Sequence, residues 1–195
     1  MANDWNQIWR ERAHSERNPD PWLVRSLHLL PPAGRVLDLA CGRGRNALYL
    51  AMRGYRVTAV DASAEALAQV DAEARRRGLH IDTLQQNMED CPILDLPPFD
   101  VVMQFFYLQR SLLPELRRLV RPGGFMIVRT FSRAGAFPGG PGNPAFALDP
   151  GELPKLLDGW QILMHEEGID QAHRGGSLAG VVARRPLPEA CGRCA

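Results

Sequence analysis

The sequence predicts an α/β domain in which helices cover both faces of a mostly parallel sheet. Strand and helix patterns alternate along the chain, which is typical of that class. A glycine-bent loop follows the first predicted strand, and the second strand, 56–61, is apolar enough to be buried on both faces. The length of 195 residues suits one domain over 1–195.

The elements follow in an order that completes a sheet. Helices fill most gaps between strands, one with Ser63 as its N-cap and its end near Gly78, another beginning at Ser111. The segment from Gly168 to Gly176 is compatible with a hairpin and hence with an antiparallel last strand. Strands are expected near residues 35–40, 56–61, 80–86, 100–105, 124–130, 160–167 and 178–184.

Three other segments are predicted around this sheet. Residues 132–149 are rich in Pro and Gly and should form a long lid loop at the carboxyl edge. The loop should end at a helix with Asp149 as its N-cap, Pro150 in the first turn and Glu152 three residues past the cap. Residues 1–30 are expected to form a helical cover, and 186–195 a tail.

The glycine loop predicts a nucleotide site. Gly42 and Gly44 can take positive φ and let a ligand approach the main chain, and the next helix then directs backbone N–H groups at that ligand. Asp61 ends the second strand about 20 residues past these glycines, where a carboxylate can accept both hydroxyls of a ribose.

Two kinds of ligand fit the loop, because the spacing of its glycines satisfies a dinucleotide pattern as well as an S-adenosylmethionine pattern. Asp38, at the end of the first strand, favours S-adenosylmethionine, since its carboxylate attracts the ammonium of a methionine group and repels a pyrophosphate. Arg43 and Arg45 weaken this argument, since either can neutralise a phosphate. No stretch of sequence remains for the second domain that a dehydrogenase usually needs.

From about Trp5 to Arg185 the chain resembles the class I S-adenosylmethionine-dependent methyltransferases, and within them the small tellurite-resistance and thiopurine methyltransferase group. The matching pieces are Leu37-Asp38-Leu39-Ala40-Cys41-Gly42-Arg43-Gly44-Arg45-Asn46-Ala47-Leu48, Val57-Thr58-Ala59-Val60-Asp61, Tyr107-Leu108-Gln109-Arg110, Pro122-Gly123-Gly124 and Thr130-Phe131. This resemblance implies a Rossmann-like, seven-stranded sheet with a reversed last strand. It also implies S-adenosyl-L-methionine as methyl donor, S-adenosyl-L-homocysteine as product and a small-molecule acceptor.

The resemblance also assigns a cofactor site. Asn87 stands where the family often has an acidic residue at the adenine, and its amide oxygen can still accept from the adenine amino group. Gln109 and Arg129 are further departures, at positions where many relatives have histidine and an acid. The expected cofactor residues are Asp38, Ala40, Gly42, Arg43, Gly44, Asn46, Asp61, Ala62, Asn87, Met88, Gln104 and Phe105.

The acceptor is expected to be a thiol, a hydroxyl or a metalloid oxyanion such as tellurite or selenite. Arg129, Arg133, His173 and Arg174 could converge at the carboxyl edge and suit an oxyanion, and His173 or His165 could take a proton from a hydroxyl or thiol. No catalytic residue is obligatory, because alignment of an acceptor behind the methyl carbon supplies much of the rate. The expected substrate residues are Tyr107, Arg110, Arg129, His173 and Arg174.

Alternative functions stay open at this stage: an NAD(P)-binding oxidoreductase, or a binding protein that kept the fold without activity. Trp5 and Trp9 predict a helix with one apolar face that covers the cofactor or packs against the sheet.

Composition narrows the partners. A net charge of +1 argues against nucleic acid, and no apolar run reaches membrane-spanning length, so a cytoplasmic monomer or homodimer is expected. No metal site is expected, because Cys191 and Cys194 lack a second ligand pair.

Overall fold

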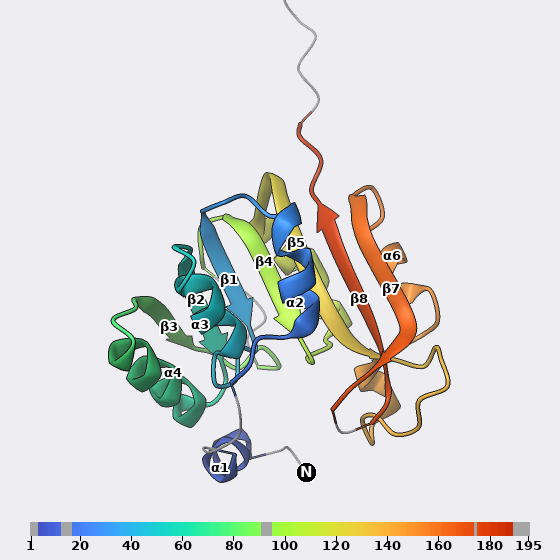
Figure 1. The fold of residues 1–195 in the computed structure, drawn as a ribbon. Helices are drawn as coiled ribbons and strands as arrows, with labels where there is room; N and C mark the ends of the chain where they lie inside the picture. The colour runs from blue at the N-terminus through green and yellow to red at the C-terminus, as the bar shows by residue number, and fades with distance from the viewer. Residues whose placement is uncertain (1–3, 13–16, 91–94, 174, 189–195) are drawn as a thin grey trace, which may run out of the picture.

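The fold is a mixed sheet with helices on both faces (Figure 1). A computed structural model describes residues 4–12, 17–90, 95–173 and 175–188. The sheet order is β3-β2-β1-β4-β5-β8-β7, with the short β6 paired to β5. The strands are β1 (Arg35–Leu39), β2 (Arg56–Asp61), β3 (Ile81–Gln85), β4 (Phe99–Phe105), β5 (Val120–Ser132), β6 (Ala147–Leu148), β7 (Gln161–Gln171) and β8 (Ser177–Arg184).

The predicted seven main strands and the reversed last strand are confirmed. β1 pairs in parallel with β2 and β4, whereas β8 runs antiparallel to both β5 and β7. The α-helices are α1 (Trp5–Glu11), α2 (Pro21–Ser26), α3 (Arg45–Ala51), α4 (Ala64–Arg76), α5 (Leu113–Leu119) and α6 (Glu152–Lys155). Short 3-10 turns lie at Leu27–Leu29, Arg110–Leu112 and Pro144–Phe146.

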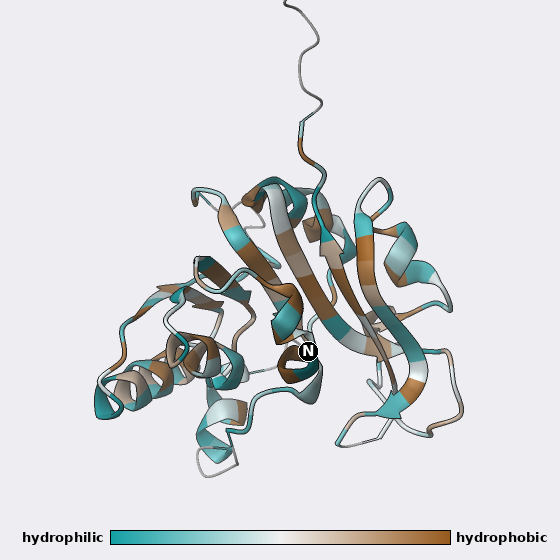
Figure 2. Cartoon of the chain, turned by 45° about the horizontal axis from the view of Figure 1, so that its top comes forward, coloured by the Kyte–Doolittle hydropathy of each residue, from teal (hydrophilic) through white to brown (hydrophobic). Residues whose placement is uncertain are grey.

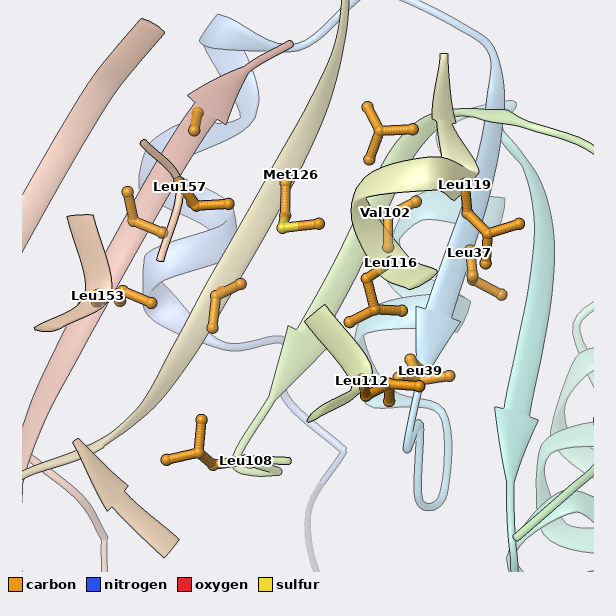
Figure 3. Close-up of a cluster of buried hydrophobic side chains, with 14 of the residues drawn as sticks. Leu37, Leu39, Val102, Leu108, Leu112, Leu116, Leu119, Met126, Leu153 and Leu157 are labelled. Carbon is orange, nitrogen blue, oxygen red and sulfur yellow. The ribbon is translucent and has the colours of Figure 1, made fainter. Parts of the chain in front are cut away.

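Buried hydrophobic side chains form a cluster on each face of the sheet. Figure 2 shows that the central strands are largely hydrophobic, as expected of strands covered on both sides. On one face, Leu112, Leu116 and Leu119 pack over Leu37 and Val102 (Figure 3). The other cluster includes Leu48, Leu50, Val70, Met103 and Trp22.

The N-terminal segment divides between two places. Trp22 of α2 is 1% exposed and packs on β8, where a Cβ added at Gly180 would lie 2.7 Å from its ring. α1 instead lies beyond the carboxyl ends of β1 and β2 (Figure 1). It is fixed to α4, since the Ser63 hydroxyl and the Glu65 N–H both donate to the Asn6 side-chain oxygen.

Two details of the predicted lid loop were wrong. Residues 147–148 form β6, which pairs with β5 inside the segment that we expected to be a loop. The next helix begins at Glu152 with Gly151 as its N-cap, at a φ of +69°, and not with Asp149. The left-handed glycine delays the helix start, while the Asp149 carboxylate pairs with Arg133.

Within the described residues, none of the helices is both long and apolar enough to cross a membrane. Cys191 and Cys194 lie outside those residues.

Candidate active site

A cavity of about 490 Å³ opens at the carboxyl edge of the sheet, within the size range of small-molecule sites. Residues that follow β1, β2 and β4 line it, and β1 and β4 flank the point where the strand order reverses. Ligands of open α/β sheets bind at such switch points. Of the predicted site residues, the cavity brings together Asp38, Ala40, Gly42, Arg43, Asn46, Asp61, Ala62, Asn87, Met88, Phe105, Tyr107 and His173.

The two glycines of the loop have the expected positive φ, but neighbouring side chains also require glycine at these positions. Gly42 and Gly44 take φ of +54° and +71°. A Cβ at Gly42 would lie 2.6 Å from the ring of Trp9, and one at Gly44 would lie 2.8 Å from Val70. The groups that approach these two glycines closely are therefore side chains of α1 and α4, and Gly44 does not line the cavity.

Left-handed backbone also ends two neighbouring strands. Ala40, directly after β1, has a φ of +53°, and Phe106, directly after β4, has a φ of +56°. This conformation costs an L-residue about 1–2 kcal/mol. Both residues line the cavity, so the strain lies where the chain must turn aside to leave space.

Asp61 is held by the main chain. Its Oδ2 accepts from the Gly42 N–H at 2.7 Å and its Oδ1 from the Ser63 N–H at 2.9 Å. Burial raises the pKa of Asp61, and these backbone hydrogen bonds oppose that rise. Each carboxylate oxygen keeps further acceptor capacity, so Asp61 can accept from two hydroxyls and still anchor the glycine loop.

Asp38 is buried with one oxygen unsatisfied. Within the described residues its Oδ2 has no hydrogen-bond partner. Burial raises the pKa of Asp38 to about 8, and the nearby positive charge of Arg45 is the main opposing influence. An unpaired buried acceptor is costly, so this side chain fits a site that receives a donor from a ligand. The ammonium of S-adenosylmethionine is a donor of that kind.

The expected adenine end is more open. Asn87 is exposed, and its side-chain oxygen accepts from the Glu89 N–H at 3.1 Å while its amide donates to Asp90 at 2.6 Å. Met88 beside it is buried. One further lone pair on the Asn87 oxygen is available for an amino group.

The arginines predicted for the acceptor belong to the framework instead. Arg129 is 4% exposed and donates to Asp20 at 3.0 Å and to Asp170 at 2.6 Å, outside the cavity lining. Arg110 makes a two-pronged pair with Glu152, at 2.5 and 2.8 Å. The structure does not place these two side chains in the cavity lining, because distant carboxylates pair with their guanidinium groups.

The predicted cluster of positive charge at the carboxyl edge does not form among the described residues. Arg133 pairs with Asp149, and His165 is exposed on β7 away from the cavity. Gln104 is buried but does not line the cavity. His173 does line it, and Arg174 lies outside the described residues.

The remaining wall is aromatic. The Phe106 and Phe131 rings meet edge to face at 5.6 Å. The Tyr107 hydroxyl donates to Gln109 at 2.5 Å, and the Gln109 amide donates in turn to the Met88 carbonyl at 3.2 Å. Burial raises the pKa of Tyr107 to about 12. The hydrogen bond to Gln109 therefore fixes the Tyr107 side chain in the wall, and the raised pKa keeps its hydroxyl neutral.

Sequence reasoning missed part of this lining. Gln86 and Glu89 flank the predicted Asn87-Met88 pair, and an extension by one residue on each side would have found them. Phe131 lies in the Thr130-Phe131 pair, to which the resemblance assigns no role. No sequence pattern marks Arg12 and Arg17 as site residues, because it is the tertiary position of the N-terminal segment that brings them to the cavity. The missed residues are Arg12, Arg17, Cys41, Arg45, Val60, Gln86, Glu89, Phe106, Phe131 and Ala172.

Comparisons with known proteins agree with this geometry. Residues 36–124 match the family model of a methyltransferase domain. TehB of Haemophilus influenzae, described as a probable S-adenosyl-L-methionine-dependent methyltransferase, is 27% identical over 157 residues, which cover 78% of this chain and 54% of that protein. The ubiquinone biosynthesis O-methyltransferase of Maricaulis maris is 35% identical over 157 residues, covering 74% and 59%.

A solved structure shares the fold. The crystal structure of TehB from Haemophilus influenzae matches with a TM-score of 0.78 at 21% identity, over 93% of this chain and 67% of that chain.

Fold and site together define an α/β protein with a cavity at the switch point between β1 and β4, the place where ligands of such sheets bind. Over residues 36–124 the chain is similar to methyltransferase domains, and it shares the fold of TehB, which is described as a probable S-adenosyl-L-methionine-dependent methyltransferase. The chain spans little more than half the length of the curated relatives named above.

Proposed function

We propose that the protein binds S-adenosylmethionine in the 490 Å³ cavity and catalyses methyl transfer to a small neutral acceptor. The observation that carries the proposal is the buried oxygen of Asp38 in the wall of that cavity, which has no hydrogen-bond partner in the described part of the chain. A carboxylate in this position attracts a cationic amino-acid group and disfavours a diphosphate.

The residues present fit this cofactor along its length. Asp38 would accept from the ammonium, Asp61 from the ribose hydroxyls, and Asn87 from the adenine amino group. S-adenosylmethionine, when bound, supplies a sulfonium methyl group that is already activated. The protein's own contribution is to orient the acceptor and exclude water, which supplies about 7–11 kcal/mol of a barrier without a general base.

The acceptor wall favours a thiol or a hydroxyl over a metalloid oxyanion. Phe105, Phe106, Tyr107 and Phe131 line this part of the cavity. Arg45 beside the Phe106 ring is paired with Asp20, and Arg110, Arg129 and Arg133 are paired with carboxylates elsewhere. A desolvated oxyanion needs a cation or several donors. The relative from Maricaulis maris, whose name is that of an O-methyltransferase, supports an oxygen acceptor.

Proton removal from such an acceptor falls to His173. It is exposed and lines the cavity, so it can accept a proton and pass it to water.

Calorimetry with S-adenosylhomocysteine tests the cofactor. We expect binding to the folded protein and no change in NADH fluorescence on mixing. A folded sample that fails to bind S-adenosylhomocysteine overturns the proposal, and NADH binding favours the oxidoreductase alternative.

A screen of acceptors with detection of products by mass tests the chemistry. Thiols and small phenols should gain a methyl group, whereas selenite and tellurite should not. Methylation of tellurite or selenite alone would overturn the neutral-acceptor assignment, and binding without turnover of any compound would favour an inactive binding protein. A monomer or homodimer stays a prediction, which light scattering on the purified protein checks.

A further inference from the structure

We propose that Arg45 binds the carboxylate of the cofactor's amino-acid group, opposite Asp38, and that buried Asp20 is the positioning residue for Arg45. The inference rests on the proposed function and deepens it, because it assigns the second charge of the zwitterion. It also makes the segment that carries Asp20 part of the cofactor site.

Arg45 is the first residue of α3 and lines the cavity. Its side chain is 36% exposed, and its guanidinium carbon lies 5.4 Å from the centre of the Phe106 ring. Within the described part of the chain, its guanidinium makes a single hydrogen bond, from Nη2 to Asp20 at 2.8 Å. A guanidinium has five N–H donors, so most of them are available to a carboxylate.

The charges in the cavity match a zwitterion. Asp38 is negative when ionised and has one free oxygen, while Arg45 is positive and close enough to oppose the rise in the pKa of Asp38. An amino-acid group carries both an ammonium and a carboxylate. Arg45 supplies the planar donor fork that suits a carboxylate, which Asp38 itself repels.

The neighbouring Arg43 is a weaker candidate. Its guanidinium group donates to the Gln69 side chain at 2.6 Å and to the Arg12 carbonyl at 2.5 Å. These contacts direct it toward α1 and α4. Arg45 is therefore the arginine of the glycine loop whose guanidinium group is available to the ligand.

Asp20 fixes Arg45 from behind. It is 2% exposed, and its Oδ1 accepts from the Trp22 N–H at 2.9 Å and from Arg129 at 3.0 Å. Its backbone N–H donates to the Asn46 side chain at 2.9 Å, so Asp20 holds the first two residues of α3. A side chain so constrained presents Arg45 in one orientation and reduces the entropy lost on binding.

Two ligands that differ only in the carboxylate test the role of Arg45. Calorimetry should compare S-adenosylmethionine with decarboxylated S-adenosylmethionine, on the wild type, Arg45→Gln and a control, Arg56→Gln, at the opposite edge of the sheet. Arg45→Gln should weaken S-adenosylmethionine by about 10- to 100-fold, the range of a hydrogen bond to a charged group, and the decarboxylated ligand less than threefold. The control should leave both affinities unchanged.

The outcomes separate this inference from the proposed function. Equal losses for both ligands, or no loss for either, overturn the role of Arg45 while the cofactor site stands. Failure of the wild type to bind either ligand removes the proposed function and the inference together. Arg45→Lys, which keeps the charge without the fork, should show an intermediate loss for S-adenosylmethionine.

A double-variant cycle tests Asp20. Asp20→Asn keeps an oxygen for the Trp22 N–H and removes the charge, so it should weaken S-adenosylmethionine severalfold in the wild type and have no effect in the Arg45→Gln background. An equal effect in both backgrounds overturns the positioning role. Circular dichroism checks folding, and Asp20→Ser serves in the same cycle if the Asn variant does not fold.

Discussion

The two halves of the carboxyl edge use charged side chains in opposite ways. In the β1–β2 half, the Asp61 carboxylate is held by backbone N–H groups, and Asp38 keeps an oxygen that has no partner among the residues that the structure describes. In the β5–β8 half, by contrast, Arg129 is buried and paired with two carboxylates. A charge that lines the cavity and keeps hydrogen-bonding capacity indicates a ligand, whereas a buried charge paired with side chains outside the cavity indicates framework.

Arg129 gives the largest expected effect. Arg129→Met should lower the free energy of unfolding by about 3 kcal/mol, because it removes a buried charged partner from Asp20 and leaves Arg45 as the remaining cation on that carboxylate. Arg133→Ala is the matched control, and it should cost less than about 1 kcal/mol since its pair with Asp149 is exposed. Urea unfolding measures both. Equal, small losses would show that the β5–β8 half is not held by Arg129.

Asp61 should matter most for binding. Asp61→Ala removes the proposed acceptor of both ribose hydroxyls and the anchor of the Gly42 N–H, so S-adenosylhomocysteine should bind at least about 100-fold more weakly. Asp82→Ala, an exposed carboxylate on β3, should leave the affinity unchanged in the same titration. A similar effect of both variants would mean that overall charge, and not the ribose contact, sets the affinity.

Asp38 should make binding depend on pH. Its pKa is raised to about 8 in the free protein, so below that pH a proton must leave before the ammonium can pair with the carboxylate. Affinity for S-adenosylhomocysteine should therefore rise by roughly tenfold per pH unit up to about pH 8 and then level off. Calorimetry at several pH values checks this, and Asp38→Asn should flatten the profile.

Asp38 should also reduce the stability of the free protein. Its folded pKa lies above the ordinary value of 3.8, so its contribution to stability is fully present below pH 3.8 and is lost as pH rises through about 8. Asp38→Asn should consequently raise the free energy of unfolding by about 1–3 kcal/mol at pH 8 while weakening the ligand. Lower stability of the variant at pH 8 would show that the carboxylate is not desolvated.

Tyr107 gives the smallest expected effect. Tyr107→Phe removes the hydrogen bond to Gln109 and should change the free energy of unfolding by about 1 kcal/mol, with little change in affinity for S-adenosylhomocysteine. Turnover with the best acceptor should fall less than about fivefold if the ring alone forms the wall. A larger fall in turnover would assign the hydroxyl to the reaction.

The sequence predicts the fold well because the fold depends on local patterns. The order of apolar strands and helices predicted the seven main strands and the reversed β8. The predicted start of a helix was wrong where the φ angle of a single residue determines which residue begins the helix. The left-handed Gly151 moves the start of α6 to Glu152, although Asp149, Pro150 and Glu152 read as a helix start.

The residues of the site also divide into those that local patterns predict and those that only tertiary packing determines. Asp38, Gly42 and Asp61 were predictable because the ends of adjacent parallel strands must meet. The partners of the arginines were not, since Asp20 lies 109 residues before Arg129 and Glu152 lies 42 residues after Arg110. Which carboxylate takes a given guanidinium depends on tertiary packing, and that packing leaves no periodic signal.

The left-handed residues that end β1 and β4 have a further consequence. Ala40 and Phe106 shape the cavity wall through main-chain geometry, and Phe106 does so by its φ as well as by its ring. Exchange of neighbouring wall side chains such as Tyr107 or Phe131 would then change which molecules fit without moving the backbone at these two positions. Such a scaffold would allow the proposed acceptor preference to be redesigned while the proposed cofactor site is kept.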